Sequence, residues 1–331
     1  MILALRALGL GDLLTAMPAL RGLRRALPGV ELALAAPSAL APLVHQARVV
    51  DRMVAVPSAV SAPPANFAWR GPSPSLAVNL HGQGPQSTDA LRGLRPGRLW
   101  SYGLGESPPW DPQEHEVRRW CRLVEAYGCG TKPEDLYLGP LTGHDGAVLI
   151  HPGAAHPQRR WPPQRYAAVA RAIAGRGLPV RVTAGPHERV LAMDVAVRAG
   201  LPIESVISDI DLSRLADLVR GSRLVVCGDT GIAHLATAYR TPSIVLFGPQ
   251  SPARWGPPVS PRHRVLWRPD AADGNPPDRL RHAAWLPHPA LLRIEAVDVV
   301  AAADDLLSGA GTAVDWPSKG EYVAQLRLDG R

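Results

Sequence analysis

The sequence has few cysteines and no long apolar run, and each shortage excludes a class of protein. Its three cysteines, at 121, 129 and 227, form neither a CxxC pair nor a cluster with histidine, which excludes a disulfide scaffold and a structural zinc site. No apolar stretch approaches the roughly 18 residues of a membrane-spanning helix. The apolar start lacks a basic region and a cleavage site, so we interpret it as a first strand. We predict a cytoplasmic protein with reduced, buried thiols and no metal site.

Lysine is also scarce, so positive charge is carried almost entirely by arginine. Lysine occurs only at positions 132 and 319, whereas the formal net charge of the 331-residue chain is +7. This excess suits an anionic donor or an anionic lipid surface, and a peripheral membrane contact stays open. The sequence has no long basic run interleaved with aromatic residues, and we therefore expect no nucleic-acid partner.

Short apolar runs alternate with amphipathic stretches along the chain, which is typical of parallel α/β sheets. Polar, glycine-containing residues at 139–146 interrupt this alternation. We therefore predict an α/β protein of two Rossmann-like domains, residues 1–142 and 143–311, with parallel sheets facing a central cleft. The tail 312–331 either crosses back to the first domain or is loose, and 256–290 is predicted to be an irregular loop. A monomer is the default expectation.

The expected elements place six loops at strand ends. In the first half, strands are expected at 2–8, 31–36, 49–56 and 75–80, and helices at 12–27 and 112–127. In the second half, strands are expected at 147–150, 179–183, 203–207, 223–227 and 243–247, and helices at 163–176, 187–199, 211–220, 231–239 and 295–308. Ligands of such sheets bind outside the carboxyl ends of the strands. The candidate loops are 9–12, 79–86, 151–161, 184–188, 227–231 and 247–255.

The first of these loops, Gly9-Leu10-Gly11-Asp12, is not a dinucleotide-binding fingerprint. Such a fingerprint requires a third glycine where Leu14 stands, and a carboxylate at Asp12 would repel the pyrophosphate. Two interpretations remain. Asp12 is an ordinary helix N-cap, or it is a general base that the helix end keeps ionised near neutral pH, with the glycines allowing an acceptor to approach closely.

The loop over 151–162 (HPGAAHPQRRWP) suits a phosphate group. The planar forks of Arg159 and Arg160 match phosphate oxygens, and the small residues before them leave room. The alternative is a proline-rich surface turn with solvated arginines. Trp161 is expected to be a packing residue.

Two further loops suit the rest of a nucleotide sugar. In 227–235 (CGDTGIAHL), the N–H groups of Thr230 and Gly231 at a helix start would bind a diphosphate. In the same stretch Asp229 could accept hydrogen bonds from sugar hydroxyls, and His234 lies one turn into the helix; an ordinary cap is the alternative. Glu188 either holds a ribose or base edge or only favours the start of a helix.

These motifs together resemble glycosyltransferase family 9, the heptosyltransferases that use ADP-heptose. The likeness lies in GDLL at 11–14 with MPAL at 17–20, in HPG and RWP within 151–162, in GDTG at 228–231 with His234, and in LFGP at 246–249. It implies a GT-B fold and an inverting, metal-independent transfer, with a nucleotide-diphosphate sugar as co-substrate and no other cofactor. It also implies that Asp12 is the catalytic base. Donor contacts are implied for Arg160, Glu188, Asp229, Thr230, Gly231 and His234, with Arg159 beside them.

The sequence departs from this family in two places: Ala154 and Ala155 stand where the family often has hydroxyl residues, and the acceptor side differs as well. Gly11, His81 and Gln83 are the acceptor-side candidates, yet residues 81–86 lack the basic residue usual in the family. A glycan, a lipid-linked acceptor and a small molecule therefore all stay open. Two other functions also stay open: a GT-B-type nucleotide-sugar epimerase or hydrolase, and a non-catalytic nucleotide-sugar-binding protein, against which the retention of Asp12 argues.

Overall fold

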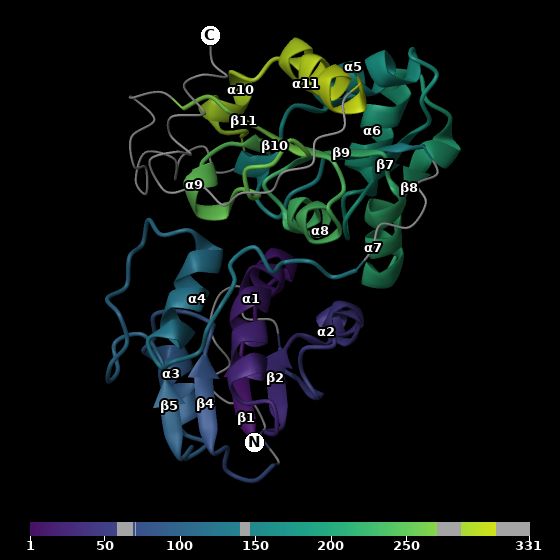
Figure 1. Ribbon diagram of the computed structural model, residues 1–331. Helices are drawn as coiled ribbons and strands as arrows, with labels where there is room; N and C mark the ends of the chain where they lie inside the picture. The colour runs from purple at the N-terminus through teal and green to yellow at the C-terminus, as the bar shows by residue number, and fades with distance from the viewer. Residues whose placement is uncertain (58–68, 70, 140–145, 270–285, 309–331) are drawn as a thin grey trace. The chain divides into compact units, whose positions relative to one another are not determined.

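The computed structural model describes residues 1–57, 69, 71–139, 146–269 and 286–308. The chain divides into two compact units, Met1–Gly139 and Pro140–Arg331 (Figure 1). The predicted boundary between 142 and 143 and the predicted tail 312–331 both lie outside the described residues.

The first unit contains a five-stranded, wholly parallel sheet in the order β3-β2-β1-β4-β5. Its strands are β1 (Ile2–Leu5), β2 (Leu32–Ala36), β3 (Arg52–Ala55), β4 (Leu76–Asn79) and β5 (Arg98–Trp100), and its helices are α1 (Leu10–Ala26), α2 (Ala41–Ala47), α3 (Gln86–Arg92) and α4 (Glu116–Glu125). The central strands β1, β2 and β4 are buried along their whole length, as expected for a parallel sheet covered on both faces.

The second unit contains a six-stranded parallel sheet in the order β11-β10-β9-β6-β7-β8. Its strands are β6 (Val148–His151), β7 (Val180–Thr183), β8 (Val206–Ile207), β9 (Leu224–Gly228), β10 (Ser243–Phe247) and β11 (His263–Trp267). Its helices are α5 (Pro163–Ala174), α6 (Arg189–Ala199), α7 (Leu212–Gly221), α8 (Gly231–Tyr239), α9 (Pro252–Trp255), α10 (Pro289–Leu292) and α11 (Ala296–Ser308).

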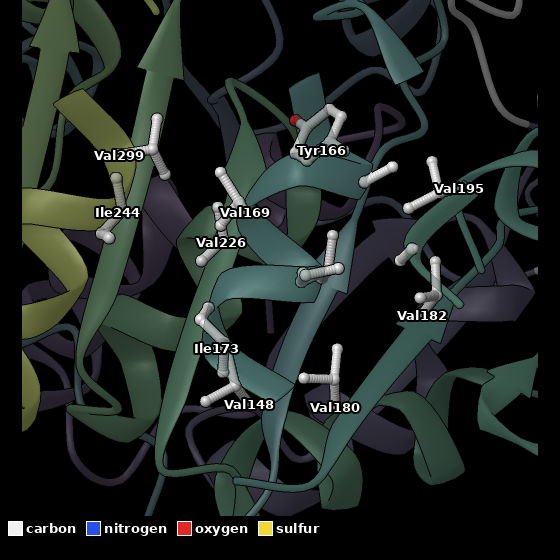
Figure 2. Close-up of a cluster of buried hydrophobic side chains, with 14 of the residues drawn as sticks. Val148, Tyr166, Val169, Ile173, Val180, Val182, Val195, Val226, Ile244 and Val299 are labelled. Carbon is white, nitrogen blue, oxygen red and sulfur yellow. The ribbon is translucent and has the colours of Figure 1, made fainter. Parts of the chain in front are cut away.

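Helices cover both faces of the second sheet. Helices α5, α6 and α11 pack together on one side, and α7 packs against α8 on the other (Figure 1). Figure 2 shows the core under α5, where Val169 and Ile173 of the helix lie over Val148 and Val226 of the sheet. Trp161 is fully buried beside this core and donates its indole N–H to the carbonyl of Ile294 at 3.0 Å, which confirms its packing role.

The structure confirms two parallel α/β sheets and corrects several expected elements. Helix α1 begins at Leu10 instead of residue 12, so Gly9 and not Asp12 is its N-cap. The stretch 256–290 is not wholly irregular, because β11 at His263–Trp267 forms the edge strand of the second sheet beside β10. Sequence patterns also missed β5, α2, α3, α9 and α10, all of ten residues or fewer, whose periodicity is too short to recognise. The expected strand at 203–207 is mostly a 3₁₀ turn, with only Val206–Ile207 paired.

Candidate functional site

In each unit the strand order creates one point where successive connections leave in opposite directions. In the first unit this point lies between β1 and β4, and in the second it lies between β6 and β9. A crevice forms outside the carboxyl ends of the strands at such a point, and ligands of open α/β sheets bind there. The residues that follow these four strands carry Asp12, His81, the arginine pair and Asp229.

Asp12 lies in the first turn of α1, directly after β1. One carboxylate oxygen, Oδ2, accepts the N–H of Gly9 at 3.1 Å, which satisfies one of the free donors at the start of the helix. The other oxygen, Oδ1, lies 3.3 Å from Nη2 of Arg6. The side chain is 28% exposed, so part of the carboxylate can still meet a ligand.

Arg6 is a part of this site that the motif analysis missed. It is fully buried, and its Nε donates to the backbone carbonyl of Asp12 at 2.9 Å. Its Nη1 donates to the carbonyl of Leu80, the first residue after β4, at 2.5 Å. One guanidinium therefore connects the loops that follow β1 and β4. The available signal was a charged residue inside the otherwise apolar run ILALRAL at 2–8.

Glu116, at the start of α4, balances the charge of Arg6 in the interior. Its Oε1 accepts from Nη2 of Arg6 at 3.0 Å and from the indole N–H of Trp120 at 2.8 Å, and its Oε2 pairs with Arg119. Burial alone would raise the pKa of Glu116, but the two arginines hold this pKa below its usual value. Glu116 is therefore an ionised, buried counterion.

The pKa of Asp12 moves in the opposite direction. Burial raises this pKa, and the lowering effect of Arg6 and of the Gly9 N–H does not cancel it, in part because Glu116 also raises it. The N–H of Gly9 at the helix start lowers this pKa, as expected of a helix end, but burial has the larger effect. A carboxylate with a raised pKa is a stronger base than an ordinary aspartate.

His81 lies on the same edge of the first unit. Its Nδ1 accepts the N–H of Ala7 at 3.2 Å, and its own backbone N–H donates to the side chain of Asn79. Burial, reinforced by Arg6, lowers the pKa of His81 to about 4, so the ring is neutral near pH 7 and carries its proton on Nε2. The other acceptor-side candidates differ: Gly11 is part-buried in the first turn of α1, and Gln83 is exposed on the loop after β4.

In the second unit Arg160 and Glu188, which follow β6 and β7, contact each other. The Nη2 of Arg160 lies 3.2 Å from Oε1 of Glu188, and its Nε donates to the carbonyl of Ala154 at 2.9 Å. The other oxygen of Glu188 accepts the N–H of Gly185 at 3.1 Å. The Arg160 side chain remains 37% exposed, so the fork is held in place while its outer face is open to solvent.

The loop after β9 faces the other arginine of the pair. Nη1 of Arg159 lies 3.4 Å from Oδ2 of Asp229, whose side chain is only 6% exposed. Thr230 is the N-cap of α8 and Gly231 its first residue, so their N–H groups lie at the positive end of a nine-residue helix. The ring of His234, one turn further, meets the ring of Trp255 edge to face at 6.1 Å.

Gly153 lies directly against the carboxylate of Glu188. A Cβ atom at this position would lie 1.9 Å from Oε2 of Glu188, which is closer than any real contact. The glycine in HPG therefore serves the placement of Glu188.

The described residues contain neither a metal-binding cluster nor a membrane-spanning helix. No group of three or more His, Cys, Asp or Glu side chains there is arranged to hold a metal ion. None of the helices in those ranges combines the length and the hydropathy that a bilayer-spanning segment needs.

Comparison with known proteins gives relatives in sequence and in fold. The sequence model for glycosyltransferase family 9 (heptosyltransferase) matches residues 131–280. Lipopolysaccharide heptosyltransferase 1 of Salmonella typhimurium is 23% identical over 289 residues, which cover 77% of this chain and 90% of that protein.

Two solved structures show the same architecture. A glycosyl transferase family 9 structure from Veillonella parvula has a TM-score of 0.77 at 19% identity, covering 93% of this chain and 97% of that chain. An Escherichia coli heptosyltransferase solved with ADP has a TM-score of 0.67 at 18% identity, covering 92% and 99%. The fold is thus that of the GT-B glycosyltransferases. The chain is a glycosyltransferase, similar in sequence and fold to the heptosyltransferases of family 9.

Replacing Gly153 with alanine is expected to displace the Glu188 carboxylate. The variant loses the hydrogen bonds of Glu188 to Gly185 and Arg160, so the free energy of unfolding should fall by about 1–2 kcal/mol. Urea denaturation measures this fall. The control is Gly221→Ala, whose Cβ meets nothing within 4 Å and whose effect should stay within about 0.5 kcal/mol. Equal stability of the two variants would contradict the close approach at Gly153.

Proposed function

We propose that this chain transfers a heptose from ADP-heptose to a hydroxyl group of a glycan, a lipid-linked or a small-molecule acceptor. The names of its relatives support the sugar, and the structural neighbour solved with ADP supports the nucleotide. The observation that carries the proposal is the part-exposed Asp12 carboxylate, held at the point of the first sheet where an open α/β fold binds its ligand.

Asp12 is the proposed general base. The backbone N–H of Gly9 and the side chain of Arg6 each contact one carboxylate oxygen, so both oxygens keep a lone pair. The raised pKa of Asp12 favours acceptance of a proton from the acceptor hydroxyl. The neutral His81, with its proton on Nε2, is the proposed hydrogen-bond donor to the acceptor. Gly11 and Gln83 complete the proposed acceptor side.

The second unit is proposed to bind the nucleotide diphosphate. The open face of Arg160, the neighbouring Arg159 and the N–H groups of Thr230 and Gly231 supply positive charge for the departing diphosphate. Glu188 is the proposed partner of the ribose or the base. Asp229 and His234 are proposed donor contacts; the ion pair of Asp229 with Arg159 adds a role in holding that arginine.

The proposed reaction is a single displacement without a metal ion. The acceptor oxygen attacks the anomeric carbon, Asp12 takes its proton, and the bond to the diphosphate breaks on the opposite face, so the anomeric configuration inverts. NMR of the product should show inversion, and excess EDTA should leave the rate unchanged. A retained configuration, or a rate lost to EDTA and restored by a divalent ion, would contradict this reaction.

We also propose that the enzyme acts in the cytoplasm as a monomer, with a peripheral membrane contact when its acceptor is lipid-linked. The free, buried cysteines Cys121, Cys129 and Cys227 support a reducing compartment.

Changing Asp12 to Asn is expected to reduce kcat by about 10²–10⁴-fold, because the amide cannot accept the proton. ADP affinity, measured by isothermal titration, should not change. The control is Asp51→Asn, at the amino end of the strands, where the new amide oxygen can still accept the N–H of Leu32. Unchanged turnover in the Asp12 variant would place the base elsewhere.

Changing Arg160 to Ala is expected to weaken ADP binding by about 10–100-fold, the loss expected for charge-assisted hydrogen bonds to phosphate. Titration without added metal measures this directly. Arg198→Ala removes an exposed arginine of the same unit that pairs with Asp194, and it should bind ADP normally. Equal ADP affinities in the two variants would mean that the 151–162 loop has only a structural role.

A further inference from the structure

Arg6 and Glu116 form a buried pair around the carboxylate that we take to be the base. The guanidinium of Arg6 is fully buried, lies 4.7 Å from the ring centre of Trp120, and donates to two backbone carbonyls and three side chains. A buried arginine of this kind can only persist if its charge and its N–H groups are satisfied. Its contacts extend from the first two turns of α1 to the loop after β4, and both segments carry proposed acceptor-side residues.

The Nη2 group of Arg6 is shared unequally between the two carboxylates. It lies 3.0 Å from Glu116, whereas Asp12 and Thr15 lie 3.3 Å away. Glu116 also accepts hydrogen bonds from Arg119 and Trp120. Asp12 thus receives the weaker contact with Arg6, and its carboxylate is oriented without being fully neutralised.

We propose that Arg6 and Glu116 are positioning residues for Asp12: Arg6 aims the carboxylate at the acceptor, and Glu116 draws Arg6 away so that the carboxylate stays basic. The inference rests on the proposed role of Asp12 as the base. The charged and titratable groups around Asp12 are Arg6, the first residue after β1, Glu116 and Arg119 from α4, and His81 from the loop after β4. Since His81 is neutral, the charged groups are two cations, Arg6 and Arg119, and two anions, Glu116 and Asp12. Asp12 is the part-exposed member of this set.

The two positioning residues should move the acidic limb of the pH profile of kcat/KM in opposite directions. In Glu116→Gln the negative charge that raises the pKa of Asp12 is lost and Arg6 is freed to pair with it, so the limb moves to lower pH. In Arg6→Met the cation that lowers this pKa is lost, so the limb moves to higher pH. In Arg6→Lys the charge remains but the fork is lost, and kcat/KM should fall about 10–100-fold through misorientation.

The experiment measures pH profiles, ADP affinity and the titration of the Asp12 carboxyl carbon by NMR in the full chain. Arg6→Met leaves the buried carboxylate of Glu116 with one partner fewer and can impair folding. The double variant Arg6→Met/Glu116→Gln removes both buried charges, so it should fold even if Arg6→Met alone does not. Its limb should lie between those of the two single variants. The matched control is the exposed pair Arg52 and Glu31, 3.0 Å apart in the same unit; Arg52→Met and Glu31→Gln should leave the profile unchanged.

Each outcome separates this inference from the proposed function. If Asp12→Asn abolishes transfer but the acidic limb is the same in the Glu116, Arg6 and double variants, Arg6 and Glu116 are only structural and the inference is overturned. If Asp12→Asn keeps its activity, the proposed base is wrong. In that case, an Asp12 pKa that NMR titration finds lowered in Glu116→Gln and raised in Arg6→Met would still establish the electrostatic coupling.

Discussion

In both units, the loops that carry the candidate residues follow strands that are neighbours in space but distant in sequence. All described strands of each sheet are parallel, so their carboxyl ends share one edge, and the strand order puts β1 beside β4 and β6 beside β9. Asp12 and the residues near His81 are separated by about 70 positions, yet Arg6 contacts the backbone of both loops. The parallel pairing is therefore the constraint on which both candidate sites depend.

The two units treat charge differently at that edge. In the first, a buried arginine and a buried glutamate surround a part-exposed aspartate, and burial makes this aspartate more basic. In the second, arginines that are about one-third exposed are held by acidic side chains that are themselves mostly buried. The first arrangement suits the acceptance of a proton, and the second suits the binding of an anion.

Buried ion pairs of this kind add little to the free energy of unfolding, because the cost of desolvating the charges opposes the attraction between them. Their value in this protein is geometric. Arg6 makes the first turn of α1 and the end of β4 depend on each other. Glu188 similarly connects the loop after β7 to Arg160, and in this position its carboxylate occupies the space that a Cβ at position 153 would take. A small residue and a pair of ions together decide where the side chains of the site can lie.

The sequence by itself determined the α/β class, most strand and helix positions in the second unit, and the loops that hold the site, because hydrophobic periodicity and glycine-rich strand ends are local signals. Helix α8 and strand β10 have the residue limits that the pattern predicted. Only the tertiary structure showed that Asp12 is not an N-cap, that β11 completes the second sheet, and that Arg6 and Glu116 lie beside Asp12. Glu116 is 110 positions from Arg6, and no local pattern marks a charged helix residue as buried; the sign of the Asp12 pKa shift depends on that burial, which exists only once the strands and α4 are packed together.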